Sequence, residues 1–269
     1  MTTGLLRFEL TTARSGRTVL LFAGGFALAS LVVALVGLSA GGVLAVQGFA
    51  RTSVSLLQLV IWAVPLVALL SGAAAGAECR EAEFVFALPV KRSDVLLSRW
   101  AAHVVVLGAA LLLGLGAAGI VIGAFAGAAD GLRYVALTGI SCLLLAACLA
   151  LGLMIGIMAR TRTRALAVAI GAWFVLGVGI DLLAIAALAI LPPGVASWEL
   201  VALLAINPVA AARVLGLGLF GADVLAGPTG AALRAVLSGW GAWVLLATLL
   251  VWTALPLVVA SRALQQRDL

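Results

Sequence analysis

The fourth apolar stretch of the chain carries four sulfur-bearing residues. Their spacing decides whether they could bind one soft metal ion together. This stretch, residues 135–158, contains Cys142, Cys148, Met154 and Met158. Sulfur ligands suit Cu(I), and the two methionines, four residues apart, share one face of a helix. The two cysteines are six residues apart and point to different faces. We therefore expect all four side chains to pack in the core, where methionine fills irregular gaps.

The sequence also argues against metal-dependent or nucleotide-dependent catalysis. His103 is the single histidine, which rules out an H-E-x-x-H zinc site, and we expect it to pack near the start of the third apolar stretch. Lys91 is the single lysine, and it does not belong to a G-x-x-x-x-G-K-[ST] phosphate-binding loop. We predict that the chain is not an enzyme and that it binds no cofactor or metal itself.

One acidic residue, Asp181, lies deep inside the fifth apolar stretch. A charge in the middle of a membrane helix costs roughly 2.5–3.5 kcal/mol on insertion scales, so this side chain should face protein or water. Two interpretations remain open. Asp181 either lines a substrate path or pairs at a subunit contact, or it is a structural group that is protonated or hydrogen-bonded to a neighbouring helix.

Charges of both signs gather in "AECREAEFVFALPVKRSDVLLSRW", residues 77–100, between two long apolar stretches. Pro89 is expected to end one helix after Leu88, and Ser93 can cap the next. A merely solvated connector has no need of two phenylalanines, so we predict a docking surface for a cytosolic protein. The alternative is an ordinary solvated loop. The predicted docking residues are Glu78, Glu81, Glu83, Phe84, Val85, Leu88, Pro89, Lys91 and Arg92.

The elements that must position these residues are membrane helices. Of the 269 residues, 65% are hydrophobic and only 10% are charged, too few to cover the surface of a soluble protein. Stretches of 18 or more apolar residues can span a bilayer. The sequence predicts an all-α membrane protein with six transmembrane helices, at about 18–40, 54–76, 100–126, 135–158, 165–191 and 236–260.

The distribution of basic residues predicts the orientation of these spans. If the N-terminus is cytoplasmic, the inside segments hold twelve Lys and Arg residues and the outside segments hold four. This asymmetry follows the positive-inside rule, so we expect both termini in the cytoplasm. It also explains the net charge of +6 without nucleic acid as a partner. The inside segments are 1–17, 77–99, 159–164 and 261–269.

The segment before the first span, residues 1–17, favours an amphipathic helix lying in the plane of the membrane. Leu5, Phe8 and Thr12 lie near one face of such a helix. Basic side chains of the segment can reach lipid headgroups: these are Arg7, Arg14 and Arg17. The alternative is an unstructured basic tail.

Glycines four residues apart predict close helix packing within the membrane, because small residues let helix backbones approach each other. The sets are Gly37/Gly41, Gly72/Gly76, Gly119/Gly123/Gly127 and Gly152/Gly156. Together they favour a tight bundle.

The longest external segment, residues 192–234, is mostly apolar, whereas a disordered loop would be more polar. We expect short helices that lie on the outer membrane surface or dip partly into it. Its candidate docking residues for a periplasmic partner are Trp198, Asn207, Pro208 and Arg213.

The six spans, the N-terminal segment ending near Arg17, and "LPVKRSDVLLSRW" after the second span resemble the ABC-2 type permeases. These are membrane subunits of ATP-binding-cassette transporters, and the resemblance covers the whole chain. It implies one transmembrane domain, residues 1–269, in the bacterial cytoplasmic membrane. It also implies a second copy of the chain as partner and a separate cassette ATPase, which carries ATP and Mg²⁺ and docks on residues 77–99.

Finer details resemble the permease of the nitrous-oxide-reductase maturation system. They are Trp173 followed by Asp181 in the fifth span, and "NPVAAARVLGLGLFGADVLAG", residues 207–227. This resemblance implies a role in copper processing, with a sulfur species as another cargo. Two other functions remain open: a secondary transporter or channel that needs no ATPase, and a membrane scaffold that recruits an ATPase and a periplasmic protein.

Overall fold

The computed structural model describes residues 2–14, 17–39, 45–81, 92–126, 131–179, 182, 206–220, 237 and 240–266. Within these ranges the chain is made of helices and turns, without a β-strand. The helices are α1 (Thr2–Arg14), α2 (Arg17–Ser39), α3 (Ala45–Glu81), α5 (Arg92–Ala126), α6 (Gly131–Met158), α7 (Arg162–Phe174), the π-helix η1 (Val175–Gly179), α10 (Pro208–Leu219) and α12 (Gly241–Gln265).

Among the described residues, six helices are long and apolar enough to cross a membrane, in agreement with the predicted number of spans. They are α2, α3, α5, α6, α7 with η1, and α12. The second and third spans extend beyond their predicted ends, whereas the sixth, expected at 236–260, is α12 from Gly241 to Gln265. The second span was expected at 54–76, and α3 runs from Ala45 to Glu81. The third was expected to begin at residue 100, and α5 begins at Arg92. Helices satisfy their own backbone groups, so they continue unbroken past the edge of the apolar stretch.

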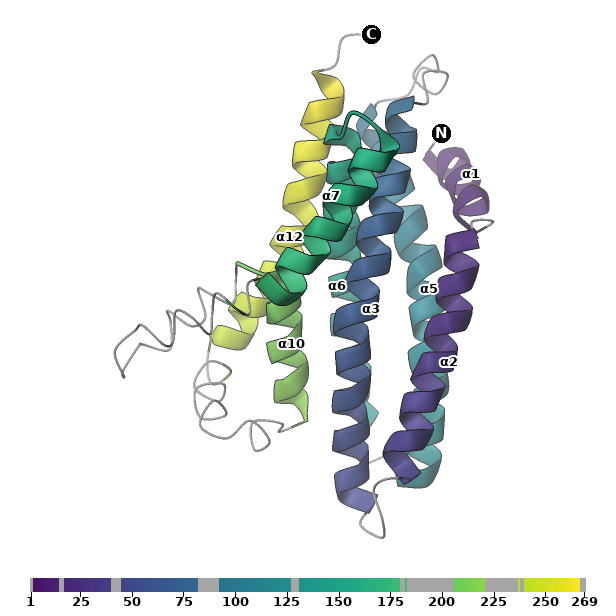
Figure 1. Ribbon diagram of the computed structural model, residues 1–269, viewed down its shortest axis with the longest axis vertical. Coiled ribbons are helices and arrows are strands. Elements are labelled where there is room, and N and C mark those ends of the chain that lie inside the picture. The colour runs from purple at the N-terminus through teal and green to yellow at the C-terminus, as the bar shows by residue number, and fades with distance from the viewer. Residues whose placement is uncertain are drawn as a thin grey trace, which may run out of the picture.

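The bundle is built around α3 and α6, which form the most extensive helix contact. α2 and α5 pack together on one side and α12 packs on α6 on the other, while α7 crosses the bundle obliquely (Figure 1). α1, the end of α3, the start of α7 and the end of α12 all lie at one end of the bundle (Figure 1). We call this the charged end, because the predicted inside segments meet there.

The contact between α3 and α6 is made backbone to backbone at four glycines. A Cβ atom added to Gly72 would lie 2.5 Å from the Leu149 carbonyl oxygen, and one added to Gly152 would lie 2.5 Å from the Leu69 carbonyl oxygen. Gly76 and Gly156 meet the backbone of the opposite helix in the same way. The predicted close packing is therefore confirmed for Gly72/Gly76 and Gly152/Gly156, which face each other within one chain.

The other glycine sets behave less uniformly. Gly37 packs against the side chain of Thr52, and Gly119 lies under the ring of Tyr134. The Tyr134 hydroxyl donates to the Leu115 carbonyl oxygen at 2.7 Å. A Cβ on Gly123 would meet nothing within 4 Å among the described residues, so Gly123 makes no close helix contact there. Gly41 and Gly127 lie outside the described residues.

The segment 192–234, which was predicted to be external, contains the helix α10, and most of this helix is buried. Its residues 208–212 are all buried, and α10 contacts α3, α6 and α12. The prediction of a short helix in this segment is confirmed, and α10 packs among the other helices of the bundle. The apolar side chains of α10 pack against other helices. This packing removes more apolar surface from water than a position at the membrane surface would.

Asn207 joins α10 to the π-helix. Its Oδ1 accepts from the Val209 backbone N–H at 2.9 Å, which caps α10, and its Nδ2 donates to the Leu176 carbonyl oxygen at 2.7 Å. The side chain is fully buried, and Pro208 beside it is buried as well. Both were predicted to bind a periplasmic partner, and neither is available on the surface of the chain.

Replacing Asn207 by alanine is expected to cost about 2 kcal/mol of folding stability, since it removes a helix cap and a donor to a buried carbonyl. Asn207→Ser keeps an oxygen for the cap but is too short to reach Leu176, so about half the loss should remain. Thermal unfolding in detergent, followed with a thiol-reactive dye that detects exposure of buried Cys79 and Cys148, measures both. Equal melting temperatures for the wild type and the alanine variant would contradict this assignment.

Candidate functional site at the charged end of the bundle

The predicted docking segment lies between two helices that reach the charged end. Glu83, Phe84, Val85, Leu88, Pro89 and Lys91 fall outside the described residues. α3 leads to this segment and ends at Glu81, and α5 leaves it and begins at Arg92. Asp94 lies in the first turn of α5, where an acidic side chain favours the helix N-terminus. Ser93, predicted to cap this helix, lies inside it instead, because α5 already begins at Arg92.

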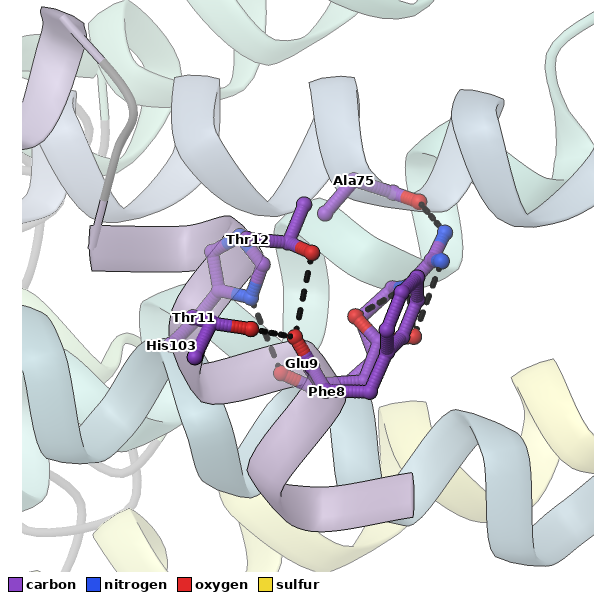
Figure 2. Close-up of polar contacts among 7 residues, drawn as sticks. Phe8, Glu9, Thr11, Thr12, Ala75 and His103 are labelled. Atoms are coloured by element: carbon purple, nitrogen blue, oxygen red, sulfur yellow. Dashed lines mark hydrogen bonds and ion pairs between the residues drawn. The ribbon is translucent and has the colours of Figure 1, made fainter. Parts of the chain in front are cut away.

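The most buried charges of this end are Glu9 on α1 and Arg99 on α5. The Arg99 Nε donates to both carboxylate oxygens of Glu9 at 3.1 Å, and Nη2 donates to Oε1 at 2.9 Å. The exposed fractions of the two side chains are 4% for Glu9 and 10% for Arg99. Nη1 of Arg99 donates to the Ala75 carbonyl oxygen of α3 at 3.1 Å (Figure 2). One guanidinium thus connects α1, α3 and α5.

This arrangement uses the geometry that arginine alone provides. The planar guanidinium directs its N–H groups toward a carboxylate and, at the same time, toward a backbone carbonyl. A buried ion pair gains little net stability over apolar residues of the same shape, whereas removal of one partner leaves an uncompensated charge. The pair therefore specifies where α1 lies more than it adds to overall stability.

The polar side chains next to the pair make hydrogen bonds within their own helices, α1 or α5. His103 is half-buried, and a hydrogen bond of 2.9 Å joins its Nδ1 to the Arg99 carbonyl oxygen (Figure 2). On α1, Thr11 and Thr12 donate to the Phe8 carbonyl oxygen at 2.7 and 3.0 Å. The predicted packing of His103 near the start of the third span is confirmed.

α1 is a helix, and its buried face is the one that the sequence analysis did not identify. Phe8 is 62% exposed and Thr12 is exposed, while Glu9 and Ala13 form its buried face. Sequence reasoning overlooked Glu9, and one signal was present: Glu9 is the only acidic residue before Glu78. A lone acid in a basic, apolar segment indicates a buried basic partner.

Two further contacts connect the helix ends beside the docking segment. Arg92 is half-buried, and its Nη1 donates to the Leu264 carbonyl oxygen near the end of α12 at 2.7 Å. Glu78 and Arg162 form an exposed ion pair at 3.4 Å between α3 and α7. Beneath them, α3, α5, α6 and α12 share a small apolar cluster. Its buried members are Cys79, Val95, Leu96, Leu153, Ile157, Ala260 and Leu264.

Of the remaining predicted residues, Arg213 alone has a described side chain. Asp181 and Trp198 lie outside the described residues, the side chain of Glu81 is not described, and Arg213 is half-buried on α10. The structure thus brings only Glu78 and Arg92, of the predicted residues it describes, close to the docking segment.

The sulfur-bearing side chains of α6 differ in how far they are buried and in the clusters that they contact. Cys148 belongs to the main core, Cys142 packs against it, and Met154 packs against the small cluster of the charged end, as predicted. Met158 is exposed, so the expectation that it packs in the core is wrong. Within the described ranges, no group of three or more His, Cys, Asp or Glu residues could hold a metal ion.

One sequence pattern of the chain also occurs in hydrolases, and the structure shows whether it lies where a catalytic serine would. Residues 37–41 read G-L-S-A-G, the spacing of the nucleophile elbow G-x-S-x-G. That motif works at a turn from a strand to a helix, whereas Gly37 and Ser39 lie in the last turn of the membrane helix α2. The pattern is therefore in the wrong structural context for a catalytic serine.

Comparison with known proteins agrees with this architecture. The family described as ABC-2 family transporter protein matches residues 9–269. A protein of Pseudomonas aeruginosa named "Probable ABC transporter permease protein NosY" is 28% identical over 276 residues, an alignment that covers 98% of each chain. These matches confirm the resemblance predicted from the spans and the charged segment. The chain belongs to the ABC-2 family of transporter proteins.

Proposed function

We propose that this chain is the permease subunit of an ATP-binding-cassette transporter and that a separate ATPase docks on the segment between α3 and α5. One observation supports this proposal above all. α3 runs unbroken from Ala45 to Glu81 and α5 runs unbroken from Arg92 to Ala126. Both helices cross the membrane, so a displacement of the segment between them moves two spans directly.

The docking surface is proposed to combine an apolar centre with a charged rim. Its centre is Phe84, Val85, Leu88 and Pro89, which would seat in a groove of the ATPase. Its rim is Glu78, Glu81, Glu83, Lys91 and Arg92, which would set the orientation. Interfaces of this kind draw most of their affinity from a few apolar anchors, while rim charges guide association.

The work of transport is proposed to enter through this surface. ATP and Mg²⁺ belong to the ATPase, because the sequence lacks a phosphate-binding loop. Two permease chains would pair around a central path in the bacterial cytoplasmic membrane, and closure of two ATPase subunits would tilt the spans. The basic segments of the charged end favour a cytoplasmic position for that end under the positive-inside rule.

The process served is proposed to be the maturation of the copper sites of nitrous oxide reductase. The relative named NosY and the resemblance of the segment 207–227 favour it. Asp181 is proposed to line the path of the cargo, since an acid in a membrane span is retained where it faces protein or water. A periplasmic protein would receive the cargo at residues 192–234, with Trp198 and Arg213 as proposed contacts.

The docking surface is tested by co-expressing the chain with a candidate cassette ATPase and purifying the complex in detergent. Phe84→Ala/Leu88→Ala should weaken association about tenfold or more and abolish permease-dependent ATP hydrolysis, because two apolar anchors are lost. The matched control, Ile120→Ala/Leu132→Ala, removes two exposed apolar side chains near the ends of α5 and α6 away from the charged end, and it should change neither quantity by more than about twofold. Unchanged association in the docking variant would instead favour a secondary transporter or channel.

A further inference from the structure

We infer that Glu9 and Arg99 are positioning residues that make α1 move together with α3 and α5 when the ATPase acts. This inference rests on the proposed function. If force enters at the segment between α3 and α5, every element fixed to the ends of these helices near that segment takes part in the movement. α1 is fixed there by the Glu9–Arg99 pair.

The attachment of α1 to the bundle involves few buried side chains besides this pair. α1 contacts α5 extensively and α2 only slightly. Among the side chains of α1 that are described, only Glu9 and Ala13 are buried. Leu10 is half-buried and an alanine methyl contributes little apolar contact, so the charge-assisted hydrogen bonds of Glu9 to Arg99 are the strongest polar attachment of α1 to the bundle among the described residues.

The position of Arg99 makes it a junction between the helices that flank the docking segment. It lies two turns into α5, and its second N–H group reaches the Ala75 carbonyl oxygen of α3. The same guanidinium therefore contacts both flanking helices and α1. A carboxylate bound at two oxygens by a planar fork also fixes orientation as well as distance, so rotation of α5 carries α1 with it.

The consequence is that movement reaches a helix that does not itself span the membrane. α1 exposes Arg7 and Phe8 on the side away from Glu9. When the pair is intact, these side chains follow α5. When the pair is broken, α1 keeps its helical hydrogen bonds but loses its fixed place on the bundle.

Three exposed positions allow a direct test by pulsed electron spin resonance on the permease–ATPase complex. They are Phe8 on α1, Leu97 on α5 and Met158 at the end of α6. Pairs of cysteines at these positions are spin-labelled in a background where Cys79, Cys142 and Cys148 are alanine. Distances 8–97, 8–158 and 97–158 are measured without nucleotide and with Mg²⁺, ATP and vanadate.

We expect the 97–158 and 8–158 distances to change together with nucleotide, while 8–97 stays constant and narrow. In Glu9→Gln, the 8–97 distribution should broaden at least twofold, and 8–158 should no longer follow 97–158. Thr11→Ala, which removes a hydroxyl bond of the same helix without touching the pair, should behave like the wild type. Purification as a folded, ATPase-bound complex confirms that the Glu9→Gln variant has not simply unfolded.

Three results would overturn the inference, and they separate it from the proposed function. A nucleotide-dependent 97–158 distance accompanied by a changing 8–97 distance in the wild type means that α1 does not follow α5. An 8–97 distribution equally narrow in Glu9→Gln means that the pair does not position α1. A constant 97–158 distance in a complex that hydrolyses ATP means that α5 does not transmit movement, and the proposed coupling fails with it.

Discussion

Replacing Gly152 by leucine is expected to force α3 and α6 apart and to prevent recovery of most of the folded protein. A side chain at this position meets the Leu69 carbonyl oxygen and the backbone of Ala73, not the flexible tip of a neighbouring side chain. Overpacking usually costs about 1–3 kcal/mol where side chains can adjust. Backbone in a helix cannot adjust without moving the helix, so we expect a loss of more than about 3 kcal/mol.

Gly139→Leu provides the matched control, because Gly139 is on the same helix and a Cβ there would meet nothing within 4 Å. It should leave the melting temperature within about 2 °C of the wild type, whereas Gly152→Leu should lower it by about 10 °C or abolish folding. Gly152→Ala should give an intermediate loss. Similar behaviour of the two leucine variants would show that α3 and α6 do not pack through this glycine.

Replacing Arg99 by methionine is the second change with a large expected effect. It leaves the Glu9 carboxylate buried with no partner at the guanidinium position, and breaking a buried pair in this way costs about 3–5 kcal/mol. Glu9→Leu/Arg99→Met removes both charges and should recover most of the loss, because apolar residues of similar volume replace such pairs at little cost. Thermal unfolding of the single and double variants gives the interaction energy of the pair.

Glu78→Gln is the control, because it removes an exposed ion pair and not a buried one. It breaks the ion pair with Arg162, whose two side chains are about half exposed, and an exposed pair of this kind contributes about 0–1 kcal/mol. A loss from Arg99→Met no greater than that from Glu78→Gln would mean that water reaches Glu9, and the pair would not define the place of α1.

The charged segment contains two kinds of residue: apolar residues predicted to bind a partner, and arginines that make contacts within the chain. The apolar residues predicted to dock a partner remain a prediction for experiment, whereas Arg92 contacts the end of α12 within the chain. Arg99, which sequence reasoning treated only as one of the charges of an inside segment, is the best-connected of the described charges at this end. Its neighbours Trp100 and His103 also bond to backbone carbonyls, those of Ala146 and Arg99.

Sequence alone determined the membrane character, the all-helical class, the six spans and the family resemblance. Each depends on properties that are local in the chain. A run of apolar residues long enough for a bilayer must form a helix in lipid, because its backbone groups have no other partners. Asp94 in the first turn of a helix likewise follows from neighbouring residues. The capping role of Asn207 was missed, although an asparagine directly before a proline is a local signal for the start of a helix.

Only the tertiary structure decided which distant residues meet. Glu9 and Arg99 are 90 residues apart, and Gly72 and Gly152 belong to helices separated in the chain by α5. Neither contact leaves a periodic or adjacent signal. Glycine spacing predicts close approach without naming the partner helix, and an acid predicts a basic partner without saying which of sixteen Lys and Arg residues it is. Packing of the helices makes that choice, because burial penalises every arrangement that leaves a charge unpaired or forces two backbones apart.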